Sequence, residues 1–99
     1  MLFLIYRKDK PGHLQVRLDN HKKHLEYLAP HGDKVVIGGP TLGLNPGTRE
    51  EEMTGSFLIM DAVSWEAVED FVKNDPFTLA GLFSTTIIER WKHGKHTQT

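Results

Sequence analysis

Cysteine is absent from this 99-residue sequence, which also lacks long apolar runs and a strong excess of either charge. Without cysteine, the chain has no disulfide bond, thiol nucleophile or cysteine-ligated zinc or iron–sulfur centre. The apolar run 2–6 ends at Arg7, so it is too short for the apolar segment of a signal peptide or for a membrane span. We therefore expect no membrane partner and a cytoplasmic location.

The charges nearly balance, with 12 Lys and Arg residues against 13 Asp and Glu residues. A net charge of −1 gives no long-range attraction for a phosphate backbone, so nucleic acid is not an expected partner. A charged share of 25% is typical of globular proteins. We expect one domain over residues 1–92 and a polar, disordered tail over residues 93–99.

The first half of the chain reads as a strand, a helix and a second strand. Residues 2–7 predict a buried strand. Pro11 suits the first turn of a helix, with Asp9 as its candidate cap. Apolar positions of this helix recur every three or four residues, at Leu14, Leu18, His21, Leu25 and Leu28. Residues 34–37 predict a second strand that stops at Gly38-Gly39-Pro40.

The second half repeats this order after a loop. Residues 40–54 are rich in Gly, Pro and acidic residues, which predicts a flexible and functional loop. A third strand follows over 55–61, and Ser64 is the expected N-cap of a second helix. Asp75-Pro76 interrupts that helix and caps a short turn. A fourth strand covers 83–91.

The predicted order, βαββαβ, is that of the ferredoxin-like α+β sandwich, in which two helices cover one face of a sheet. The first and third strands carry apolar side chains on both faces, as a sheet buried on both sides does. A second copy of the same sheet is the simplest cover for the other face. We therefore expect a homodimer, with higher assembly left open.

The most suggestive side chain for chemistry is His24. At about 100° per residue, Arg17, His24 and Leu28 fall within roughly 40° of one another, beside the apolar stripe. A half-buried imidazole with a charged neighbour suits acid–base chemistry. The sequence pattern alone favours the alternative, in which His24 borders the core without a chemical role. His21 is expected in the core or at the dimer interface.

Asp75 has two compatible interpretations. Before Pro76 it is a helix N-cap. A carboxylate that binds one ring nitrogen of a histidine also fixes the tautomer of that ring, leaving the other nitrogen for proton transfer. Spacing along the sequence does not determine whether Asp75 reaches His24.

Other motifs point away from cofactors and covalent catalysis. His21 and His24 have a spacing that suits a metal ion, but no third ligand follows, so no metal or other cofactor is expected. The segment 38–40 lacks the GxGxxG nucleotide pattern and favours a close backbone approach at a turn. The sequence has no GxSxG nucleophile motif.

The chain resembles the YciI-like (YCII-related) family from residue 2 to about residue 91. The resemblance rests on the order and spacing of Tyr6 with Lys8-Asp9-Lys10, Arg17 with His24-Leu25 and Leu28, Gly38-Gly39-Pro40, Thr54-Gly55-Ser56, Asp75-Pro76-Phe77 and Ala80-Gly81-Leu82-Phe83. It implies a dimeric α+β barrel of two ferredoxin-like halves, with a His–Asp pair in a cleft. In this chain the pair corresponds to His24 and Asp75.

A few family members resemble lyases or dehydrochlorinases that act on chlorinated, hydroxylated aromatics. The chain departs from the common family pattern at Lys22-Lys23 and at Glu50-Glu51-Glu52, which affects the expected pocket shape and specificity.

The expected function is cofactor-free proton transfer on a small organic molecule, as an elimination or an isomerisation. His24 would be the acid–base residue, Asp75 its orienting partner and Arg17 an anchor for an anionic group. Gly38, Gly39 and Pro40 would contact the substrate, with the two glycine amides as oxyanion donors. The alternatives are a non-catalytic dimer that binds a small molecule and a structural dimer with no cleft beside His24.

Overall fold

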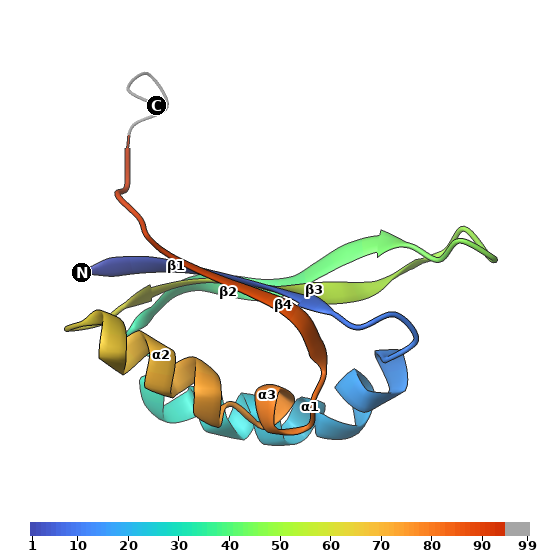
Figure 1. Cartoon of the computed structure of the whole chain (residues 1–99), viewed down its shortest axis with the longest axis horizontal. Helices are drawn as coiled ribbons and strands as arrows, with labels where there is room; N and C mark the ends of the chain where they lie inside the picture. Colours follow the sequence, from blue (N-terminus) through green and yellow to red (C-terminus); the bar gives the residue numbers. More distant parts are fainter. Residues whose placement is uncertain (95–99) are drawn as a thin grey trace.

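The computed structural model describes residues 1–94, in which a single four-stranded sheet carries all the helices on one face (Figure 1). The strands lie in the order β2-β3-β1-β4, and neighbours are antiparallel throughout. The strands are β1 (Leu2–Asp9), β2 (Val35–Leu44), β3 (Glu51–Asp61) and β4 (Phe83–Arg90). The helices are α1 (Leu14–Leu28), the 3₁₀ helix η1 (Ala29–His31), α2 (Trp65–Asn74) and α3 (Pro76–Leu79). The predicted α+β, ferredoxin-like fold is confirmed.

The core lies between the sheet and the helices, toward the end where α2 packs. Side chains of β1 alternate, so that Phe3 and Ile5 face the helices while Leu4 and Tyr6 face away. The buried apolar cluster consists of Phe3, Ile5, Leu58, Met60, Val68, Phe71 and Val72. Trp65 packs edge-on against Phe3, with the ring centroids 5.1 Å apart. This cluster attaches α2 to the middle of the sheet.

The predicted caps are confirmed for the later helices and wrong for the first. Ser64 accepts a hydrogen bond from the Ala67 amide at the start of α2, as expected for an N-cap. The first helix begins only at Leu14, after a turn at Pro11-Gly12, and its N-cap residue makes no side-chain cap bond. Asp9 does not cap this helix because its carboxylate binds Arg17 instead.

The predicted flexible loop over residues 40–54 is wrong over most of its length. β2 continues through Gly38-Gly39-Pro40 to Leu44, and β3 already begins at Glu51, so that a long hairpin projects beyond the sheet (Figure 1). The Asn45 side chain accepts hydrogen bonds from the amides of Gly47 and Thr48, which stabilises the connecting turn. The Asn-Pro-Gly sequence at 45–47 carried the signal for this turn.

The leucine stripe of α1 is only partly buried by the chain itself, with Leu28 packed against the core. Leu18 and Leu25 are about half exposed, at 48% and 50%, while Arg17 is the buried residue of this helix. His21 is exposed in the single chain as well, which contradicts the expected core position and leaves the alternative of a dimer interface untested. Periodicity identifies the apolar side of a helix, but the sheet lies beneath an adjacent side here.

In residues 1–94, no helix has the length and apolar character needed to cross a membrane. The tail predicted for residues 93–99 lies outside the described residues from 95 onward, so its disorder stays a prediction.

Candidate functional site

Asp75 is fixed at the junction of α2 and α3, where the chain leaves one helix and enters the next. Its backbone is extended, and Pro76 occupies the first turn of α3. Its Oδ1 accepts a hydrogen bond of 2.9 Å from the Phe77 amide, which makes Asp75 the N-cap of α3 as predicted. The side chain is 0% exposed, so this carboxylate has no contact with bulk water.

His24 projects from α1 onto this carboxylate. The imidazole Nδ1 lies 2.9 Å from Asp75 Oδ1, across 51 residues of sequence. The ring stacks on Phe77 with a centroid separation of 4.1 Å and an interplanar angle of 15°, and the side chain is 12% exposed. Stacking and the hydrogen bond together hold the ring in one orientation.

Arg7, at the end of β1, approaches the other oxygen of the same carboxylate. Its Nη1 donates a hydrogen bond of 2.9 Å to Asp75 Oδ2, and the arginine side chain is 1% exposed. Burial by itself would raise the pKa of Asp75. The His24 hydrogen bond, the Arg7 charge and the Phe77 amide outweigh burial and hold that pKa below its ordinary value.

An ionised carboxylate has no hydrogen to give, so the bond between Asp75 and neutral His24 must use a hydrogen on Nδ1. The lone pair of that ring then resides on Nε2. The geometry therefore answers which nitrogen of His24 is available to a ligand, a question that the sequence left open.

Arg17 forms a second buried ion pair beside the first. Its Nε and Nη2 donate to the two oxygens of Asp9 at 2.7 and 2.9 Å, and Nη2 also donates to Ser56 Oγ at 3.0 Å. The guanidinium lies over the Phe77 ring, 4.8 Å from its centroid. Two of its three nitrogens are therefore bound to neighbouring side chains, and an anionic ligand would have to use Nη1.

These side chains border a cavity of about 170 Å³ between α1 and the sheet. Its lining includes His24, Arg7, Arg17 and Phe77, the segment 38–40 of β2, and Ser56 and Phe57 of β3. A cavity of about 150 Å³ is enough for a benzene molecule, so this one accommodates a single substituted ring. The structure thus contains a cleft beside His24, and the prediction of a structural dimer without such a cleft is wrong.

Gly38 and Gly39 line this cavity from within a strand and not from a turn. A Cβ on Gly38 would clash with the Leu58 side chain, whereas Gly39 has open space around its Cα. The amides of a strand point along the plane of the sheet, and adjacent ones point to opposite sides. The two glycines are therefore better placed to let a ligand lie against the backbone than to form a pair of oxyanion donors.

Gly55 makes room for the polar residues at this end of the sheet. A Cβ at this position would clash with the backbone oxygen of Arg7 on the neighbouring strand. The close approach aligns Ser56 with Arg7 in the β1–β3 register, and the Ser56 hydroxyl then reaches Arg17.

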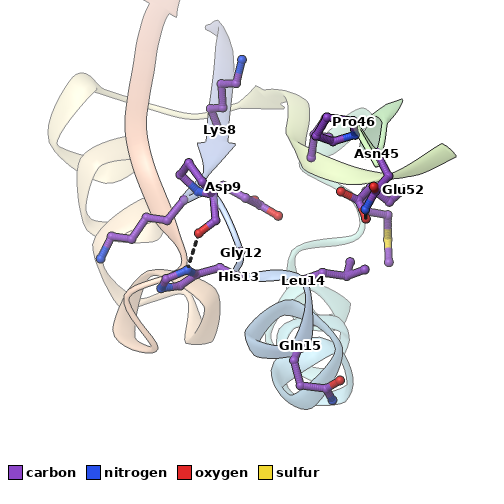
Figure 2. A pocket seen from close by; sticks show the side chains of 13 residues that line it. Lys8, Asp9, Gly12, His13, Leu14, Gln15, Asn45, Pro46 and Glu52 are labelled. Atoms are coloured by element: carbon purple, nitrogen blue, oxygen red, sulfur yellow. Dashed lines mark hydrogen bonds between the residues drawn. The ribbon is translucent and has the colours of Figure 1, made fainter. Parts of the chain in front are cut away.

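Two larger hollows lie elsewhere on the molecule. The one in Figure 2, of about 530 Å³, lies between the start of α1 and the β2–β3 hairpin, and Lys8, His13, Asn45 and Glu52 line it. His13 there bonds the Pro11 carbonyl oxygen and no carboxylate. The other, of about 480 Å³, lies near Tyr27, at the opposite end. Among residues 1–94, no three His, Cys, Asp or Glu side chains gather where a metal ion could bind.

Sequence reasoning singled out His24, Asp75 and Arg17; His24 and Arg17 line one cavity, and Asp75 is buried in contact with His24. It missed Arg7, which lies on the same strand face as Phe3 and Ile5. A charged residue in phase with core positions of a strand is the signal that could have identified it.

Comparisons with known proteins agree with this fold. A family model described as the YCII-related domain matches residues 1–92. The chain belongs to this family. Protein YciI of Escherichia coli is 30% identical over an alignment 97 residues long, which covers 93% of this chain and 97% of that protein.

Two further relatives carry more specific names. A protein of Emericella nidulans described as "Derivative of benzaldehyde biosynthesis cluster protein C" is 32% identical over an alignment 75 residues long, which covers 72% of this chain and 76% of that protein. A 5-chloro-2-hydroxyhydroquinone dehydrochlorinase (TftG) of Burkholderia phenoliruptrix, solved in complex with 2,5-dihydroxybenzoquinone, is 67% identical. The match covers 97% of this chain and 98% of that one, with a TM-score of 0.88.

Proposed function

We propose that this protein is an acid–base enzyme that eliminates hydrogen chloride from a chlorinated hydroxyhydroquinone, with His24 as the catalytic residue. The observation that carries the proposal is the buried 2.9 Å contact between His24 Nδ1 and Asp75, beside a cavity that fits one aromatic ring. The 67% identity to a 5-chloro-2-hydroxyhydroquinone dehydrochlorinase supports the choice of substrate.

The reaction requires only proton transfers and the departure of chloride. His24 Nε2 first takes the proton of the hydroxyl next to the C–Cl bond, and the proton returns to the chlorine-bearing carbon, which produces a ring ketone. Nε2 then takes the proton of the hydroxyl para to that ketone. The electron pair shifts through the ring as chloride leaves, and a hydroxyquinone results.

The balance closes without an external oxidant. The substrate loses one proton and one chloride. Because chloride leaves with an electron pair, the ring passes from the oxidation level of a hydroquinone to that of a quinone. Asp75 accepts a hydrogen bond from Nδ1 and stabilises the imidazolium that forms when Nε2 takes the proton. Arg17 Nη1 is the candidate contact for the developing phenolate, and residues 38–40 form the wall against which the ring lies.

The test is turnover of 5-chloro-2-hydroxyhydroquinone by the wild-type protein and by His24→Asn. Chloride release and quinone absorbance are followed together under anaerobic conditions, because air oxidises hydroquinones. We expect His24→Asn to lose about 10²–10⁴-fold in kcat, the usual contribution of general acid–base catalysis. His93→Asn is the matched control and retains most of the activity, because this exposed histidine follows β4 and does not line the cavity.

Two results would contradict the proposal. One is an unchanged kcat in a folded His24→Asn protein. The other is thermal stabilisation by hydroquinones without release of chloride from any of them, which would favour the alternative of a non-catalytic binding protein.

We also propose that two copies pair through the open face of the sheet. Its apolar side chains are Leu4, Tyr6, Ile37, Phe57, Ile59 and Ile87. Ile37 is 62% exposed in the single chain, and covering such a face from water is the usual reason for a small domain to dimerise. Light scattering after size-exclusion chromatography at low micromolar concentration should give twice 11.3 kDa, and a stable monomer would overturn the pairing. The cytoplasmic location stays a prediction.

A further inference from the structure

Arg7 is an unusual residue to find at the centre of a small domain. Its side chain is 1% exposed, and its Nε is buried without a hydrogen-bond partner among the described residues. The guanidinium lies over the Phe83 ring, 4.6 Å from its centroid. Burial lowers the pKa of Arg7 even though the neighbouring carboxylate of Asp75 opposes that shift. The unpartnered Nε and the lowered pKa both indicate that burial of this cation costs stability.

Stability alone is a poor reason for such a residue. A buried ion pair seldom contributes more than an apolar pair of the same size, because desolvation of both charges offsets their attraction. The unpartnered Nε adds to that cost. Methionine would cover the same space on the face of β1 that already carries Phe3 and Ile5. The position of the charge, not its contribution to packing, distinguishes Arg7.

The carboxylate of Asp75 has two oxygens with separate partners. Oδ1 receives His24 Nδ1 and the Phe77 amide, and Oδ2 receives Arg7 Nη1, each at 2.9 Å. The Phe77 amide alone would leave the carboxylate free to rotate about its Cβ–Cγ bond. Arg7, on the opposite side, prevents this rotation and favours the ionised form.

We propose that Arg7 is a positioning residue, which holds Asp75 so that His24 stays in the tautomer with hydrogen on Nδ1 and a free Nε2 facing the cavity. The inference rests on the proposed function and deepens it, because it adds a third member to the His24–Asp75 pair. Arg17, although it lines the same cavity, does not share this role, since Asp9 and not Asp75 is its partner.

The first test is spectroscopic and needs no substrate. Long-range ¹H–¹⁵N correlation spectra under mildly alkaline conditions report which nitrogen of a neutral imidazole carries hydrogen. We expect wild-type His24 to be a single Nδ1–H tautomer and Arg7→Met to contain a mixture. The matched control is Arg90→Met on the adjacent strand β4, where the arginine is exposed and makes no contact with Asp75. It should leave the His24 signals unchanged.

The second test is kinetic, with the same variants. In metal sites, residues that orient a ligating side chain typically contribute about 10–100-fold to affinity or activity. By analogy, we expect Arg7→Met to lower kcat by such a factor, with little change in KM. A purely structural role would instead lower the fraction of folded protein and leave kcat per folded molecule unchanged. Arg7→Lys keeps the charge but replaces the rigid fork by one flexible donor, so an intermediate kcat is expected.

A folded Arg7→Met protein with the wild-type tautomer and the wild-type kcat would overturn the proposal. If Arg7→Met does not fold, the tautomer and the kcat of Arg7→Lys test the proposal instead. A mixed tautomer with reduced kcat supports the role, and identity with wild type in both readouts overturns it. Failure of the proposed function is recognised separately, because wild type would then release no chloride while the tautomer spectra still responded to Arg7→Met.

Discussion

The helix-covered face of the sheet has two ends of opposite character, built from the same two strands. At one end Phe3 pairs with Met60 and Ile5 pairs with Leu58, and all four side chains are buried in the apolar core. One pleat further along, Arg7 pairs with Ser56, and the buried groups are polar and charged.

The helix α2 bridges these two ends, and each of its ends has a cap. Ser64 caps its start over the apolar core, and Asp75 follows its last residue beside the cavity. The Ser64 side chain binds only an amide of α2, whereas the Asp75 side chain caps α3 and also binds His24 and Arg7. The apolar end stabilises the fold, and that stability supports the buried charges at the other end, to which the proposed function assigns the chemistry.

The largest effect is expected for Asp75→Asn, which should lower both the stability of the polar end and the activity of the site. The amide no longer pairs with the Arg7 cation, and loss of one partner of a buried ion pair costs about 3–5 kcal/mol of unfolding free energy. The hydrogen on Nδ1 of His24 is also no longer favoured, so kcat should fall by about 10²–10⁴-fold. Urea denaturation and chloride release measure the two losses. Wild-type kcat in a folded Asp75→Asn protein would remove this residue from the site.

A stability loss without a catalytic one is expected for Phe3→Ala at the apolar end. Removing a fully buried aromatic ring costs about 3–5 kcal/mol, because it loses apolar burial and leaves a void. Activity per folded molecule, measured at low temperature or with a stabilising osmolyte, should equal that of wild type. A matching fall in kcat would show that the two ends are not separable.

The pH dependence of stability should differ between wild type and Asp75→Asn. The pKa of Asp75 is lower in the folded protein than its ordinary value of 3.8, so ionisation favours the folded state at higher pH. This contribution is present above about pH 4 and is lost as the pH falls through the folded-state pKa. The gap in unfolding free energy between the two proteins should therefore be constant near neutrality and narrow below about pH 4. A gap that widens in acid would contradict the sign of the shift.

The smallest effect is expected for Ser64→Ala, the cap at the apolar end. Loss of an N-cap hydroxyl costs about 0.5–2 kcal/mol of unfolding free energy. Neither kcat nor the tautomer of His24 should change, because the Ser64 hydroxyl binds the Ala67 amide at the start of α2, at the opposite end of that helix from Asp75. Thermal denaturation and the same chloride assay provide the comparison with Asp75→Asn.

Local patterns predicted much of the fold. The apolar character of both faces of β1 and β3, the caps at Ser64 and Asp75 and the order of elements could all be predicted, because each depends on neighbours within a few residues. The β2–β3 hairpin could not be predicted, because the glycines and prolines of residues 40–54 are typical of a loop and only the pairing with β3 makes them a strand. The orientation of α1 was also missed, because the leucine stripe does not report which side the sheet covers.

The sequence by itself determined the residue types of the site, the cap position of Asp75 and the family to which the chain belongs. Only the tertiary structure decided that Arg7, His24 and Asp75 meet, across separations of 68 and 51 residues. These residues come from a strand, a helix and a helix junction, and no local rule relates their positions. Their contact depends on strand register and on how α1 and α3 pack against the sheet, which are properties of the whole folded chain.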